Sequence, residues 1–181
     1  KTRLAVKVAK SALDRFPNGV WFIDLAPLAE PSRVPSAVAS ALGAVEEPGR
    51  PIESAIEARL RGRRVLIVLD NCEHLTETVA ALAWRLVAAI PGLTVLATSR
   101  EPLAVTGESV YAVQPLSTPP ASAVPDPQTV EASEAGHLFA VDLTDPAVAD
   151  PAAVLLVDLS EGDVLLLGRG VELDRNRHEP E

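Results

Sequence analysis

The chain has 181 residues, 48% of them hydrophobic and only 3% aromatic, which suits one domain or one domain with part of another. Its net charge of −9 argues against a phosphate-backbone interface with DNA or RNA on this part of the protein. One cysteine excludes an internal disulfide and favours a reducing compartment, and no signal peptide or membrane-length apolar run is visible, so we expect a cytoplasmic protein.

The first part of the chain alternates helical and extended patterns. Apolar side chains at i, i+4 spacing predict an amphipathic helix over residues 2–16, ended by the Pro17-Asn18-Gly19 turn. The apolar run at residues 20–24 predicts a buried strand. Helices are predicted over residues 34–42 and 52–60, each followed by a glycine.

The next part of the chain continues this alternation. Residues 65–69 form an unbroken apolar run that ends on Asp70, and they predict the clearest strand. Thr76 is expected to cap a helix that ends before residues 91–92, and further strands are predicted in LTVLATSRE and SVYAVQPL. Strands that are apolar on both faces and alternate with helices indicate an α/β fold with a doubly wound parallel sheet. Ligands of such sheets bind outside the carboxyl ends of the strands.

The remaining chain departs from this pattern. Residues 117–132 are rich in Ser, Thr, Pro and Ala and predict a linker. Residues 133–181 are expected to be a divergent segment, with Ser133 capping a helix start, a hairpin turning at residues 160–163 and a charged, disordered end. We therefore divide the chain into a core over 1–116, a linker over 117–132 and a C-terminal segment over 133–181.

Four residues in the core carry the chemistry of a nucleotide site. Lys-Thr ends the phosphate-loop motif G-x-x-x-x-G-K-[ST], in which the Lys neutralises phosphates and the hydroxyl binds Mg²⁺. Lys1 and Thr2 have these residue types, and Asp70 supplies a carboxylate at a strand end. Arg100 follows another predicted strand, so all these side chains are expected at one edge of the sheet.

Each position also has an ordinary structural interpretation. Lys-Thr is common at helix starts, an Asp after an apolar run turns the chain or caps a helix, and Arg100 is suited to a surface ion pair. Cys72 is interpreted as a small buried residue and His74 as part of a solvent-facing turn. The order of Lys1-Thr2, Asp70 and Arg100 along one sheet favours the nucleotide site.

The segments KTRLAVKVAKSALDRFPNGVWFIDLAPL, RRVLIVLDNCEHL and PGLTVLATSREPLAVTGESVYAVQPL resemble a known family. They are similar to the NB-ARC-like ATPase core of bacterial STAND regulators, and more closely to AfsR/SARP and large LuxR-type transcriptional regulators. The resemblance covers residues 1–116, and SEAGHLF at 133–139 extends it.

The resemblance implies a P-loop NTPase-type switch. Lys1 and Thr2 correspond to the end of the phosphate loop, Asp70 to the carboxylate that holds Mg²⁺ together with Thr2, and Arg100 to a sensor of the γ-phosphate. ATP or ADP is then the ligand, the full-length protein self-associates, and DNA is bound only through domains outside this chain.

The sequence also departs from the family pattern. The phosphate-loop glycines and the strand before them are missing, so the chain is expected to begin inside its own nucleotide site. Asn71 stands where many relatives carry a second acid and cannot act as a general base, which leaves Glu73 as the candidate for orienting water and predicts slow or no ATP hydrolysis. Two alternatives remain open: a degenerate fragment that acts as a protein-interaction module, and a small P-loop kinase, which no acceptor site in the sequence supports.

Overall fold

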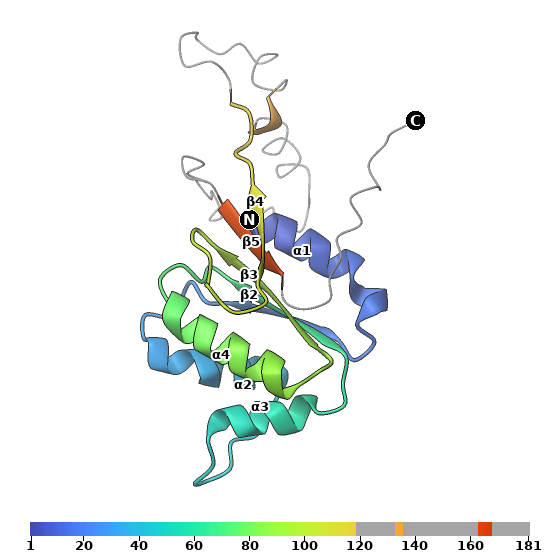
Figure 1. Cartoon of the computed structure of the whole chain (residues 1–181), viewed down its shortest axis with the longest axis vertical. Coiled ribbons are helices and arrows are strands. Elements are labelled where there is room, and N and C mark those ends of the chain that lie inside the picture. Colours follow the sequence, from blue (N-terminus) through green and yellow to red (C-terminus); the bar gives the residue numbers. More distant parts are fainter. Residues whose placement is uncertain (119–132, 136–162, 168–181) are drawn as a thin grey trace, which may run out of the picture. The chain divides into compact units, whose positions relative to one another are not determined.

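The computed structural model describes residues 1–118, 133–135 and 163–167, and the chain divides into two compact units (Figure 1). Residues 1–113 belong to one unit together with 163–167, whereas 114–118 and 133–135 belong to the other. Most of the predicted linker, the predicted hairpin turn and the charged end lie outside the described residues.

Three parallel strands, all predicted from the sequence, form the centre of the fold, and the strand predicted in SVYAVQPL is also present. The three parallel strands are β1 (Val20–Asp24), β2 (Val65–Asp70) and β3 (Leu93–Ser99), adjacent in that order. Every residue of β2 and β3 is buried, as expected for strands covered on both faces. The α/β architecture with a parallel sheet between helices is therefore confirmed.

Alternate residues of β2 pack against helices on opposite faces of the sheet. One face contacts α1 (Thr2–Ser11), whose Ala5 and Ala9 pack with Leu66 and Val68. The other face, with Ile67 and its neighbours, packs against α2 (Val34–Leu42), α3 (Ile52–Leu60) and α4 (Thr76–Ala89). This division follows from the two-residue period of a strand.

Two further strands extend this parallel part, so the whole sheet is mixed. β5 (Asp163–Leu167) lies between β3 and β4 (Ser109–Val113) and pairs antiparallel with both. β4 therefore runs in the same direction as β3, although the two are not neighbours. β5 is far from both neighbours in sequence, so the spacing along the chain does not predict its direction.

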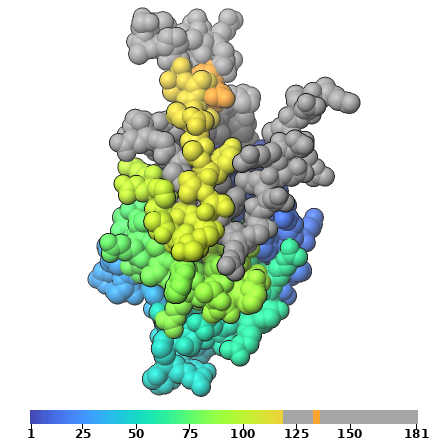
Figure 2. All heavy atoms as spheres, viewed as in Figure 1, coloured from blue at the N-terminus to red at the C-terminus, as the bar shows by residue number. Residues whose placement is uncertain are grey.

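Strand β4 also differs from the central strands in burial. Val110 and Tyr111 are exposed, and the atoms around β4 lie at the surface in Figure 2, where this part of the chain is yellow. Val113, at the end of the strand, packs against the same apolar cluster as α1. β4 therefore joins the core mainly through its end.

Two predicted helix boundaries are wrong. α1 ends at Ser11 rather than Phe16, and a tighter 3₁₀ turn, η1 (Leu13–Arg15), follows it. This turn brings Phe16 into the core, where it is 5% exposed. Thr76 is the first residue of α4 rather than its cap, because its hydroxyl donates to the carbonyl oxygens of Cys72 and Glu73 in the preceding turn.

Two hydrogen bonds between Ser117 and Glu134 connect the described residues of the second unit. The N–H of Ser117 donates to Glu134 Oε2 at 2.8 Å, and Ser117 Oγ accepts from the N–H of Glu134 at 3.0 Å. The backbone N–H of Ser117, with help from its hydroxyl, lowers the pKa of the Glu134 carboxyl. Glu134 and Ala135 are helical, as predicted, and the later residues of the predicted helix start lie outside the described residues.

Candidate functional site

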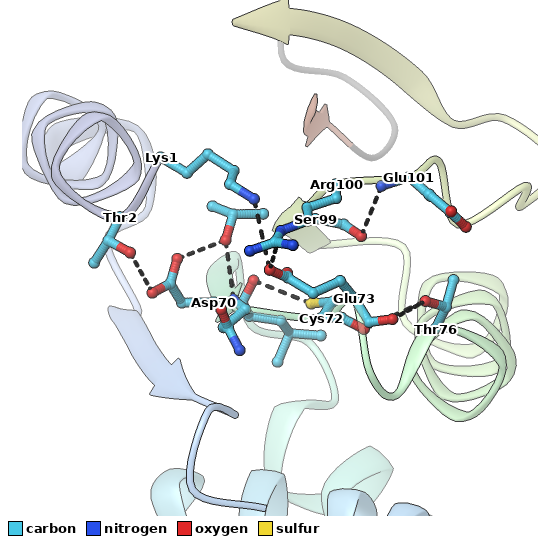
Figure 3. A network of polar contacts seen from close by, with 12 residues as sticks. Lys1, Thr2, Asp70, Cys72, Glu73, Thr76, Ser99, Arg100 and Glu101 are labelled. Atoms are coloured by element: carbon cyan, nitrogen blue, oxygen red, sulfur yellow. Dashed lines mark hydrogen bonds and ion pairs between the residues drawn. The ribbon is translucent and has the colours of Figure 1, made fainter. Parts of the chain in front are cut away.

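The predicted site residues meet where α1 begins and where β2 and β3 end (Figure 3). Lys1 and Thr2 stand at the N-terminus of α1, and Asp70 is the last residue of β2. Arg100 directly follows β3. The parallel order of β2 and β3 places their carboxyl ends side by side, because Leu69 pairs with Ala97.

Asp70 is held by hydroxyl groups from two directions. Its Oδ2 accepts from Thr2 Oγ1 at 2.6 Å, and its Oδ1 accepts from Thr98 Oγ1 at 2.6 Å. Asp70 is 4% exposed, and a carboxylate so buried requires such partners. The Thr2 contact joins residues 68 positions apart and fixes the start of α1 against the end of β2.

The backbone after Asp70 turns sharply over the end of β3. Asn71 has φ +65°, a left-handed conformation that Asn tolerates better than most residues. Its N–H donates to Thr98 Oγ1 at 3.0 Å, and the N–H of Cys72 donates to the carbonyl of Thr98 at 2.9 Å. This turn directs Glu73 back toward the site.

Glu73 bridges the two basic residues of the site. Its Oε1 lies 3.7 Å from Lys1 Nζ and 3.3 Å from Arg100 Nε. The side chains of Lys1 and Glu73 are 15% and 20% exposed, whereas that of Arg100 is 59% exposed. Among the described residues, Glu73 Oε2 is a buried polar atom without a hydrogen-bond partner. One carboxylate oxygen thus carries both ion pairs.

Cys72 and His74 take no part in this cluster of charges. Cys72 is fully buried, and burial, followed by the charge of Asp70, raises the pKa of its thiol from 9.0 to about 12. A protonated, buried thiol is a poor nucleophile, as the sequence interpretation expects. His74 Nε2 contacts the carbonyl oxygen of Leu28 at 2.8 Å and links the turns after β1 and β2.

The structure brings together all five residues that the sequence proposes, namely Lys1, Thr2, Asp70, Glu73 and Arg100. Sequence reasoning missed Thr98, which contacts Asp70 and is 1% exposed. The available signal was weak, because Thr98 is one of three polar residues in this strand, with Thr94 and Ser99. Its meaning depends on the register of β2 and β3, which the sequence alone does not supply.

The donor set suits Mg²⁺ only with help from a ligand. No group of three or more His, Cys, Asp or Glu side chains converges within the part of the chain that the structure describes. Mg²⁺ commonly keeps several waters and binds one or two protein groups together with substrate phosphates. Thr2 and Asp70 offer such a partial set, and in the described part of the chain no side chain caps α1, whose N-terminal N–H groups favour an anion.

Comparison with known proteins relates this chain to regulators. It is 44% identical over 117 residues to proteins of Mycobacterium tuberculosis and Mycobacterium bovis whose names assign them, without experimental proof, as HTH-type transcriptional regulators. The match covers 65% of this chain but 13% of each relative. The regulatory protein AfsR of Streptomyces griseus is 40% identical over 108 residues, which cover 55% of this chain and 11% of AfsR.

These matches agree with the AfsR-type part of the resemblance seen in the sequence. The chain spans only a small part of the length of these relatives. No protein-family model and no solved structure matches it. No helix in the described ranges is long and apolar enough to cross a membrane.

Proposed function

We propose that this chain is the ATP/ADP-binding switch module of a transcriptional regulator. Lys1 and Arg100 would contact the phosphates, and Thr2 and Asp70 would hold Mg²⁺. The observation that carries the proposal is the hydrogen bond from Thr2 to Asp70 at the edge where Lys1 and Arg100 also meet. A hydroxyl and a carboxylate beside two cations are the groups that a Mg²⁺–polyphosphate ligand requires.

The bound nucleotide would act through Arg100. Its side chain is more exposed than those of Lys1 and Glu73 and can follow a γ-phosphate that is present in ATP and absent in ADP. A ligand shifts a conformational equilibrium only by its differential contacts with the two states. The regulator names of the relatives support a switch whose output, including DNA binding and self-association, lies in other parts of a longer cytoplasmic protein.

Hydrolysis is proposed to be slow or absent. Glu73 forms an ion pair with Arg100, and the same oxygen, Oε1, also faces Lys1. A general base must reach the proton that it removes, and an oxygen engaged by Lys1 and Arg100 is not free to position a water molecule. The alternative of an interaction module without nucleotide binding remains the outcome to be tested.

Isothermal titration calorimetry with Mg·ATP and Mg·ADP tests this function. We expect one binding site that depends on Mg²⁺ and that Thr2→Val weakens about tenfold, because the variant keeps the shape of the side chain but removes the hydroxyl. Thr78→Val, which makes the same change in α4, is the matched control and should bind as the unaltered chain does. Absence of binding, or binding indifferent to Thr2→Val and Asp70→Ala, would overturn the proposal.

A further inference from the structure

Glu73 occupies the place between the two cations of the site. Lys1 comes from the start of α1 and Arg100 from the end of β3, and both reach the same oxygen of Glu73 (Figure 3). The formal charges of Lys1, Arg100, Asp70 and Glu73 sum to zero. The four groups together therefore present no net positive charge to a polyphosphate that enters this site.

The position of Glu73 is fixed by its backbone rather than by its carboxylate. Asn71 turns the chain, the N–H of Cys72 bonds to Thr98, and the carbonyl of Glu73 accepts from Thr76 Oγ1 at 3.1 Å. These contacts hold the main chain whether or not the side chain stays between the cations. The carboxylate can leave by rotation about its own bonds.

The carboxylate itself is poorly satisfied. Its Oε1 contacts both cations at 3.3 and 3.7 Å, longer than the strongest charge-assisted hydrogen bonds. Among the described residues its buried Oε2 has no hydrogen-bond partner, an arrangement that costs free energy. A phosphate group offers three oxygens and can form the paired contacts that an Arg guanidinium favours.

We propose that Glu73 is an internal competitor that a polyphosphate must displace from Lys1 and Arg100. This inference rests on the proposed function and adds a regulatory role for one side chain. Glu73 keeps the two cations together in the absence of ligand and raises the phosphate concentration at which the site fills. The switch then responds to abundant nucleotide and not to trace amounts.

Removing the charge of Glu73 tests the competition. We expect Glu73→Gln to bind Mg·ATP about tenfold more tightly than the unaltered chain, which corresponds to about 1.4 kcal/mol. Glu77→Gln is the matched control, since it makes the same change at an exposed position four residues away and should alter affinity less than about twofold. Sodium tripolyphosphate, titrated in parallel, reports on the phosphate contacts without the nucleoside. Circular dichroism checks that each variant is folded.

The outcomes separate this inference from the proposed function. If the unaltered chain binds Mg·ATP but Glu73→Gln binds equally or more weakly, the competition is refuted and the nucleotide site stands. If Glu73→Gln tightens tripolyphosphate binding but no protein binds Mg·ATP, the competition stands and the nucleotide function fails. If no protein binds either ligand, both fail. Should Glu73→Gln not fold, Glu73→Met, of similar length and without charge, makes the same test.

Discussion

Replacing Asp70 by Asn should destabilise the core by about 2 kcal/mol. The carboxylate accepts one hydroxyl bond on each oxygen, and a hydrogen bond to a charged group contributes about 1.5–3 kcal/mol. Asn keeps one acceptor oxygen and replaces the other by a donor. The amide oxygen can face only one of Thr2 and Thr98, so the hydroxyl proton of the other loses its acceptor.

Asp24 provides a matched control for this variant. It is the last residue of β1 and pairs in register with Asp70, but it is exposed, and its Oδ1 accepts a local bond from the N–H of Ala26. Asn supports the same local turn. Asp24→Asn should therefore change stability by less than about 0.5 kcal/mol, while it removes the same charge from the chain.

Urea denaturation followed by tryptophan fluorescence measures the difference. The chain has two tryptophans, Trp21 and Trp84, and both lie in the unit that contains the site. A loss of about 2 kcal/mol appears as a lower midpoint with an unchanged slope, and as a fall in melting temperature of about 4–8 °C. If Asp70→Asn and Asp24→Asn unfold within 0.5 kcal/mol of each other, the hydroxyl contacts do not stabilise the core as argued.

Two further predictions concern the same unit. Since the pKa of the Cys72 thiol is raised from 9.0 to about 12, unfolding releases a proton within this range. The contribution of Cys72 to the free energy of unfolding is therefore fully present below about pH 9 and should decrease above it, by up to about 1.4 kcal/mol per pH unit. Urea denaturation measured at several pH values should show this decrease in the unaltered chain and not in Cys72→Ala. The same pH dependence in both proteins would contradict the assignment to Cys72. Leu165→Pro removes a backbone N–H from the strand between β3 and β4 and should accelerate hydrogen exchange of the β4 amides. Leu165→Ala keeps that N–H and should not, and equal exchange in the two variants would argue against the antiparallel pairing.

The sequence predicts the central elements well where local signals agree. β1 begins and ends at the predicted residues, and so do α2 and α3, because apolar runs of the right period are bounded by turns and helix-ending residues. Gly43 follows α2 with φ +64°, the left-handed position that favours glycine after a helix. Such helix and strand boundaries depend on a few neighbouring residues and can therefore be predicted from the local sequence.

The features that the sequence misses depend on distant parts of the chain. The strand at 163–167 is apolar in sequence, but nothing local says that it lies between β3 and β4 or in which direction. Thr98 becomes part of the site only through the register that sets it beside Asp70. The sequence predicts Thr76 as a helix cap, yet its hydroxyl donates to the carbonyl oxygens of Cys72 and Glu73 in the preceding turn.

The two acids of the site have different partners, and this difference predicts different effects of their substitution on the stability of the fold. Asp70 is buried and contacts hydroxyls, so its loss should be seen in unfolding. Glu73 is partly exposed and contacts Lys1 and Arg100, so its loss should be seen in phosphate binding. Sequence reasoning took Asp70 as the Mg²⁺ carboxylate from its place at the strand end, and Glu73 as the candidate for orienting water because Asn71 stands where many relatives carry a second acid. The geometry gives Asp70 a role in the fold as well, so Asp70→Asn should lower both the free energy of unfolding and the affinity for Mg·ATP, whereas Glu73→Gln should raise phosphate affinity without the same loss of stability.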